Sequence, residues 1–169
     1  RLGGGKSLEN IMKLIILDRD GVINHDRADY VKSANECVPI EGSIEAIVRL
    51  NKAGFTVVIA TNQAGLAKGK FELEDLEAMH EKITALVEEQ GGELGGIFYC
   101  PHHPDDNCKC RKPMPGMLDA IEAEFNTSVE SSRNSTQLSQ TFPSWSLKRL
   151  GTAPILPGDD NSSTIKGLV

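Results

Sequence analysis

The sequence of 169 residues lacks long apolar runs and an excess of positive charge. No stretch approaches the roughly 20 apolar residues that a membrane-spanning helix requires, so we expect no membrane role. The apolar stretch Leu14–Leu17 is too short for the core of a secretory signal, which makes the cytoplasm the expected compartment. A formal net charge of -6 argues against a nucleic-acid partner, because such binding rests on a basic face.

The composition, with 39% hydrophobic and 25% charged residues, is that of an ordinary globular protein. A chain of this length buries enough surface to fold without disulfides or other cross-links. We expect one domain over residues 12–169, present as a monomer, and a flexible leader over residues 1–11, which show no periodic pattern. The leader contains GGGKS, which imitates the end of a P-loop. Because no strand precedes it and the glycine spacing is incomplete, we expect no nucleotide site there.

Short apolar segments alternate with helical patterns along the chain. Residues 13–18, 55–61 and 97–99 predict strands buried on both faces. Residues 43–50, 72–90 and 115–125 predict helices, with Ser43 as the cap of the first and Gly54 as its stop. This alternation predicts an α/β fold, in which a doubly wound, Rossmann-like parallel sheet carries helices on both faces.

Polar residues follow each predicted strand, at the edge where ligands bind in parallel α/β sheets. Taken alone, each group is more often a turn former, a helix cap or a solvated surface charge. Their expected meeting at one edge favours a functional site. The candidates are Asp18 and Asp20 after the first strand, Thr61 and Asn62 after the second, and Arg111 and Lys112 after the third.

The loop after the third strand holds three of the four cysteines and two of the four histidines. A reducing compartment disfavours a disulfide here. Cys100, Cys108 and Cys110 with either His102 or His103 form a four-ligand set that is typical of structural zinc sites. A catalytic zinc would need an open coordination position, and none is apparent. We therefore predict an inserted zinc-binding loop.

The remaining cysteine and histidines give weaker signals. We interpret Cys37 as a small buried hydrophobe. His80 falls near the apolar face of a predicted helix and is expected to be a packing or surface residue. His25 follows the two aspartates and could lie near the mouth of the site.

The motifs LDRDGVIN, ATNQAGLAKG, CPHHPDDNCKC and RKPMPGM together resemble the haloacid dehalogenase-like phosphatases, from Lys13 to about Val129. Within that family they are similar to the branch of heptose bisphosphate and histidinol-phosphate phosphatases. The segment Tyr30–Ser33 and the Pro-Gly-Met that follows Lys112 favour the heptose enzymes. The resemblance implies a Mg²⁺-dependent phosphatase with a small phosphorylated sugar as its substrate, D-glycero-D-manno-heptose 1,7-bisphosphate, from which it removes the 7-phosphate.

The resemblance also implies roles for individual residues. Asp18 would be the nucleophile that forms an aspartyl phosphate, and Asp20 the general acid and then base. Mg²⁺ would be held by the Asp18 carboxylate and the backbone carbonyl of Asp20. Phosphoryl oxygens would be held by Thr61, Asn62 and Lys112, and the substrate's phosphate or sugar by Arg111. The zinc ligands would be Cys100, His102, Cys108 and Cys110, with His102 favoured over His103.

The sequence departs from the family pattern after about residue 131. The family has a further strand that ends in Gly-Asp, yet residues 131–158 contain no acidic residue. Gly158-Asp159 follows a short apolar run farther on, so Asp159 is either a displaced Mg²⁺ ligand or part of a turn. We hypothesise a reading-frame slip or a truncation in this region.

Three other functions stay open on the sequence. A histidinol-phosphate phosphatase would use the same chemistry on another substrate. A zinc-stabilised phosphate-binding protein would keep the site but lack turnover, because its Mg²⁺ ligands are incomplete. A phosphotransferase would pass the phosphoryl group from Asp18 to an acceptor other than water.

Overall fold

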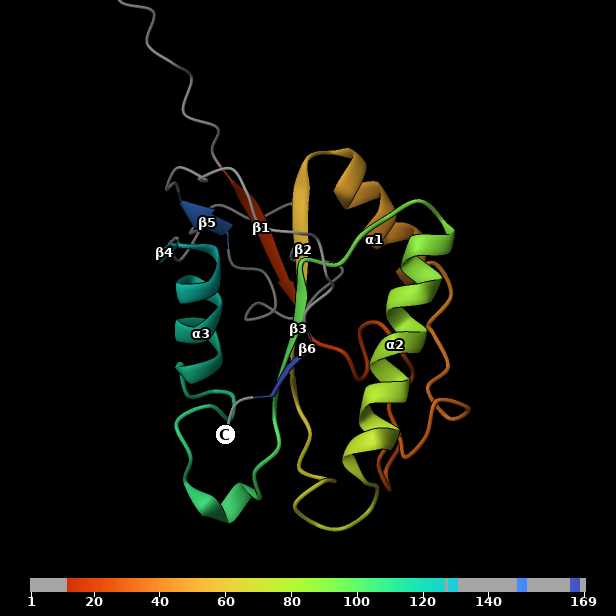
Figure 1. Cartoon of the computed structure of the whole chain (residues 1–169), viewed down its shortest axis with the longest axis vertical. Coiled ribbons are helices and arrows are strands. Elements are labelled where there is room, and N and C mark those ends of the chain that lie inside the picture. Colours follow the sequence, from red (N-terminus) through yellow and green to blue (C-terminus); the bar gives the residue numbers. More distant parts are fainter. Residues whose placement is uncertain (1–11, 127, 131–148, 152–164, 168–169) are drawn as a thin grey trace, which may run out of the picture.

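A parallel sheet of four strands in the order β1-β2-β3-β6 lies at the centre of the molecule (Figure 1). The computed structural model of the chain describes residues 12–126, 128–130, 149–151 and 165–167. The central strands are β1 (Lys13–Leu17), β2 (Phe55–Asn62), β3 (Gly96–Cys100) and β6 (Ile165–Gly167). A second, antiparallel pair consists of β4 (Ser128–Glu130) and β5 (Arg149–Gly151).

Helices cover both faces of the central sheet (Figure 1). One face carries α1 (Ser43–Lys52) and α2 (Leu73–Glu89), and the other carries α3 (Gly116–Phe125). Alternate residues of β1 supply the two cores: Ile15 and Leu17 pack toward α1 and α2, whereas Leu14 and Ile16 pack toward α3. All four are nearly inaccessible to solvent, so the predicted doubly wound α/β fold is confirmed.

The six predicted elements are all present, and their ends differ from prediction by at most two residues. The sequence pattern missed β4, β5, β6 and the short 3-10 helix η1 (Pro104–Asp106), each only three residues long. No helix in the described residues is long and apolar enough to cross a membrane. The single domain over residues 12–169 stays a prediction, since residues 131–148 and 152–164 lie outside the described ranges.

The role predicted for Ser43 was wrong. Gly42, with a φ of 81°, occupies the cap position of α1, and Ser43 is the first helical residue. The Ser43 hydroxyl donates to the backbone carbonyl of Ile23 at 2.8 Å. The hydroxyl is therefore used in a tertiary hydrogen bond and does not cap the helix. This bond connects the start of α1 to the loop that follows β1.

The carboxyl ends of β1, β2 and β3 meet at one edge of the sheet. Leu17 pairs with Ile59, and Asn62 pairs with Cys100. The register therefore places the residues that follow β1 beside the last residues of β2 and β3. Gly21, with a φ of 78°, turns the chain directly behind the two aspartates.

Candidate functional site

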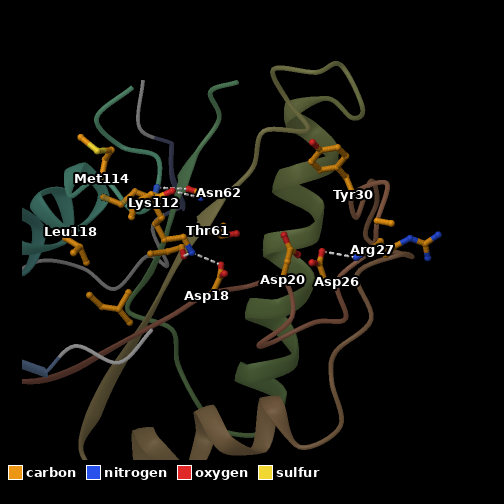
Figure 2. A pocket seen from close by; sticks show the side chains of 15 residues that line it. Asp18, Asp20, Asp26, Arg27, Tyr30, Thr61, Asn62, Lys112, Met114 and Leu118 are labelled. Atoms are coloured by element: carbon orange, nitrogen blue, oxygen red, sulfur yellow. Dashed lines mark hydrogen bonds and ion pairs between the residues drawn. The ribbon is translucent and has the colours of Figure 1, made fainter. Parts of the chain in front are cut away.

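A cavity of about 660 Å³ opens at this edge of the sheet (Figure 2). Its apolar lining includes Ile16, Ala60, Met117 and Leu118. Five of the six residues predicted from the strand ends also line it: Asp18, Asp20, Thr61, Asn62 and Lys112. These five side chains therefore lie close together, as the sequence predicted. Apolar walls surround them, which is typical of a ligand-binding pocket.

Asp18 and Lys112 form an ion pair on one side of the cavity (Figure 2). Lys112 Nζ lies 2.9 Å from Asp18 Oδ1 and donates to the backbone carbonyl of Ala60 at 2.8 Å. Burial lowers the pKa of Lys112, and the charge of Asp18 opposes that shift. The ammonium group is thereby held beside the carboxylate that faces the cavity.

Asn62 joins β2 to the loop that carries Lys112. Its Oδ1 accepts from the Lys112 backbone N–H at 3.0 Å, and its Nδ2 donates to the Lys112 carbonyl at 3.2 Å. Most of the amide is therefore used to position Lys112, and one N–H of Nδ2 is left for a ligand. Asn62 could therefore hold a phosphoryl oxygen, as predicted, only through this one N–H.

The Asp20 carboxylate is surrounded by donors. Arg19 reaches Oδ1 through Nε at 3.0 Å and through Nη2 at 2.9 Å. Asn24 donates to the same oxygen at 2.9 Å, and Gln63 Nε2 donates to Oδ2 at 2.9 Å. The carboxylate thus has a defined orientation at the cavity wall.

Thr61 is held by the same glutamine. Gln63 Nε2 donates to Thr61 Oγ1 at 2.9 Å, so this hydroxyl acts as an acceptor and its own hydrogen is left to donate into the cavity. A hydroxyl donor in this position suits a phosphoryl oxygen. Gln63 follows the predicted pair Thr61-Asn62 directly but gave no separate signal in the sequence.

The cysteine loop brings its four predicted ligands together. The ligand atoms of Cys100, His102, Cys108 and Cys110 all lie within 4.8 Å of one another. Sulfur–sulfur distances of 3.2 to 3.6 Å are too long for a disulfide, whose S–S bond is about 2 Å. Tetrahedral zinc, with Zn–S bonds of about 2.3 Å, places sulfurs about 3.8 Å apart, so the donor set fits zinc.

His102, not His103, belongs to this cluster. His102 Nδ1 lies 3.1 Å from Cys110 Sγ, whereas His103 Nδ1 accepts from the backbone of Asp105. Burial and the neighbouring thiols raise the pKa of Cys110 to about 12. The raised pKa favours the protonated thiol. A bound zinc ion would instead favour the thiolate, which is the form that zinc binds.

The Asp18 carboxylate is a candidate ligand for a hard cation. The Arg19 amide and Lys112 both contact its Oδ1. Carboxylate oxygens are ligands that Mg²⁺ prefers. Asp159, the third predicted Mg²⁺ ligand, lies outside the described residues.

Two candidates lie away from the cavity. Arg111 is half-buried, is not among the lining residues, and its Nη1 is buried without a hydrogen-bond partner in the described part of the chain. His25 is exposed and does not line the cavity either. Cys37 is fully buried, as predicted. The sequence missed Arg19, Gln63 and the far wall formed by Arg27 and Tyr30.

Comparison with known proteins gives the class of this site. Residues 13–139 match the model of a phosphatase family described as polynucleotide kinase 3 phosphatase. The matched residues include the four motifs by which the sequence resembles the haloacid dehalogenase-like phosphatases. The chain belongs to the haloacid dehalogenase-like phosphatases.

Two of the similar proteins carry the name of one particular phosphatase. A D-glycero-beta-D-manno-heptose-1,7-bisphosphate 7-phosphatase from Pseudomonas putida is 59% identical over 119 residues, which are 70% of this chain and 68% of the relative. A crystal structure of D,D-heptose 1,7-bisphosphate phosphatase from Bordetella bronchiseptica, complexed with magnesium and phosphate, is 51% identical with a TM-score of 0.66. That likeness covers 68% of this chain and 64% of the other. The chain thus spans about two thirds of the length of these relatives.

A more distant structure agrees on the fold. A candidate HAD-like phosphatase from Mesorhizobium loti is 32% identical, with a TM-score of 0.58, over 73% of this chain and 61% of the other.

Proposed function

We propose that this chain hydrolyses the 7-phosphate of D-glycero-β-D-manno-heptose 1,7-bisphosphate through an aspartyl-phosphate intermediate. The observation that carries the proposal is the pairing of Asp18 with Lys112 in a cavity large enough for a sugar phosphate. The names of the relatives support the choice of substrate. The family supports phosphoester hydrolysis as the reaction.

Asp18 is the proposed nucleophile. Its carboxylate attacks phosphorus, the bond from phosphorus to the substrate oxygen breaks, and the phosphoryl group is carried by Asp18. An anion must approach another anion in this step, so positive charge is needed at the site. Lys112 supplies a cation 2.9 Å from Asp18, and Thr61 supplies a hydroxyl donor for a phosphoryl oxygen.

Asp20 is the proposed general acid and base. Its protonated form gives a proton to the departing sugar oxygen, which leaves as an alcohol. Its carboxylate then takes a proton from the water that attacks the aspartyl phosphate, which releases inorganic phosphate and restores Asp18 and Asp20 to their starting forms. The carboxylate lies on the cavity wall, where it can serve both steps.

Two metal ions have proposed places in this chain. The Asp18 carboxylate, the backbone carbonyl of Asp20 and Asp159 would hold Mg²⁺, which when bound offsets the negative charge of the phosphoryl oxygens. Cys100, His102, Cys108 and Cys110 would hold a structural zinc ion. The zinc ligands end two residues before Lys112, so the cluster would fix the backbone of the phosphate-binding cation.

The test is ³¹P NMR of heptose 1,7-bisphosphate incubated with the purified chain, Mg²⁺ and zinc. We expect the C7 phosphomonoester signal to be replaced by inorganic phosphate while the anomeric phosphate persists. A parallel incubation with histidinol phosphate should be much slower. Loss of the anomeric phosphate, or faster hydrolysis of histidinol phosphate, would contradict the proposed substrate.

Two further outcomes would change the assigned reaction. A phosphorylated alcohol formed when glycerol is added, at the expense of inorganic phosphate, would indicate phosphotransfer. Binding of phosphate without any turnover by folded, metal-loaded protein would indicate a phosphate-binding protein.

A further inference from the structure

Arg19, the residue between the two aspartates, is fully buried, with 0% of its surface exposed. A buried guanidinium is costly unless charged and polar partners surround it. Its Nε and Nη2 both contact the Asp20 carboxylate, at 3.0 and 2.9 Å. Arg19 therefore approaches Asp20 from the protein interior, while the same carboxylate lines the cavity on its other side.

His80 holds the other end of this guanidinium. It lies on α2, is also fully buried, and its Nε2 is 3.2 Å from Arg19 Nη1. Burial and the charge of Arg19 lower the pKa of His80 to about 3, so the ring is neutral at physiological pH. Because Arg19 can only donate, Nε2 must accept and the ring proton must be on Nδ1.

The His80 Nδ1–H has no hydrogen-bond partner in the described part of the chain. An unpaired buried donor costs free energy, so it needs an explanation. A leucine or phenylalanine at this place in α2 would fill space without that cost. The contact with Arg19 is the only polar function that the described residues give to the imidazole ring.

The chain of contacts links α2 to the catalytic carboxylate across 61 residues of sequence. Asn24 and Gln63 also bind Asp20, but both belong to segments that already line or border the cavity. Arg19 and His80 connect Asp20 to the hydrophobic cluster, because the His80 ring also contacts Tyr99 of that cluster, with ring centroids 5.7 Å apart.

We propose that Arg19 and His80 are positioning residues for the general acid: His80 anchors the guanidinium, and the guanidinium fixes the plane of the Asp20 carboxylate. This inference rests on the proposed function. Proton transfer requires the acid within hydrogen-bond distance of the departing oxygen, and small misplacements are costly. Neither residue lines the cavity, so both would act through Asp20.

Such a role predicts a dependence on the leaving group. A sugar alkoxide needs a proton as it departs, whereas p-nitrophenolate is stable without one, so only the sugar phosphate depends strongly on a well-placed acid. The comparison uses kcat/KM, which reports the steps up to the first phosphoryl transfer. A residue needed only for folding would lower both rates equally.

The test compares His80→Phe with His80→Gln, in the full chain loaded with Mg²⁺ and zinc. Phenylalanine removes the acceptor, and glutamine can return one at the same reach. We expect His80→Phe to lower kcat/KM for heptose 1,7-bisphosphate by about 10- to 100-fold and that for p-nitrophenyl phosphate by less than about threefold. His80→Gln should restore most of the loss, and Ile83→Val, a core change on the same helix, should leave both values near wild type.

Arg19→Lys is the second variant, for use if His80→Phe does not fold. It keeps the positive charge but loses the forked contact, so it should show the same selective loss. Equal losses on both substrates, in whichever variant folds, would overturn the inference.

Crystal structures of the same variants separate this inference from the proposed function. We expect the Asp20 carboxylate to rotate or lose order in His80→Phe and to keep its place in His80→Gln. An unmoved Asp20 in His80→Phe would refute the positioning role. If the wild-type chain hydrolysed neither substrate, the proposed function would fail, while these structures would still decide the geometry.

Discussion

The two sides of the cavity are held in place by different means. The segment after β1 carries Asp18 and Asp20, and it buries Arg19, Ile23 and Val31 against the cluster beneath α1 and α2. The segment after β3 carries Lys112, and its residues 101–115 are exposed or half-buried. A loop that buries so little cannot be ordered by apolar contacts alone. We propose that zinc bound by the four clustered side chains supplies the order that the second segment lacks.

This difference has an energetic basis. Binding of a structural zinc ion contributes about 10 to 16 kcal/mol in isolated peptides, which is ample to order a short loop. The first segment relies on packing and on buried hydrogen bonds, which are present whether or not metal is bound. The site should therefore fail in two distinguishable ways, and the following experiments separate them.

The largest loss is expected from Asp18→Asn. The substitution keeps the size of the side chain but removes the proposed nucleophile, so kcat should fall on the order of 10⁴-fold or more. Phosphate release under saturating substrate measures this directly, and circular dichroism checks the fold. Activity within about tenfold of wild type would show that another group attacks phosphorus.

Lys112→Met tests the other side of the cavity. Loss of a cation that faces developing negative charge should lower kcat/KM by about 10²- to 10³-fold. Lys109→Met, which changes an exposed lysine of the same loop, is the matched control and should have little effect. Similar losses in the two variants would mean that general positive charge, rather than the Asp18 contact, is what matters.

Cys108→Ser should uncouple the two sides. We expect the bound zinc, measured by mass spectrometry of metals, to be lost, and hydrogen exchange to rise in residues 101–112 but not in residues 19–37. The displaced Lys112 should lower kcat/KM by up to about 10²-fold, while the remaining activity still requires Mg²⁺. Cys37→Ala removes a buried cysteine outside the cluster and should keep its zinc. Full activity in zinc-free protein would refute the coupling between the loop and the site.

Ser43→Ala gives the smallest expected effect. It removes the hydrogen bond to Ile23 and should lower the free energy of unfolding by about 1 kcal/mol, with kcat unchanged. Urea denaturation measures the first quantity. Thr84→Ala, whose hydroxyl bonds within its own helix, should cost less. A large loss of activity in Ser43→Ala would mean that the first segment is less firmly packed than its burial indicates.

Much of the fold could be predicted because its signals are local. Apolar strands and the spacing of Leu76, Met79 and Ile83 each report on burial within a few residues. The meeting of Asp18 with the ends of β2 and β3 followed from the parallel sheet alone. The cluster of four predicted zinc ligands could be recognised because their residue types gather within eleven positions, from Cys100 to Cys110.

The part that escaped prediction depends on contacts between distant residues. Arginine and histidine are polar by default, and nothing near Arg19 or His80 in the sequence shows that each is the other's buried partner. Serine is a common helix cap, so Ser43 was predicted to be one. Its hydroxyl instead donates to the backbone carbonyl of Ile23, 20 residues earlier in the chain. The narrowed role of Asn62 likewise required the position of Lys112.

The Asn62–Lys112 contact also limits how the length of this loop can vary. Cys110 and Lys112 are separated by one residue, and Lys112 is tied at its backbone to β2 and at its side chain to Ala60. An insertion between them would force either the cluster or the lysine out of place. The exposed turn at residues 104–107 has no such double attachment within the described part of the chain. Insertions should therefore be tolerated at residues 104–107 and should disrupt the site between Cys110 and Lys112. The turn at residues 104–107 is thus the place to graft a peptide or a label.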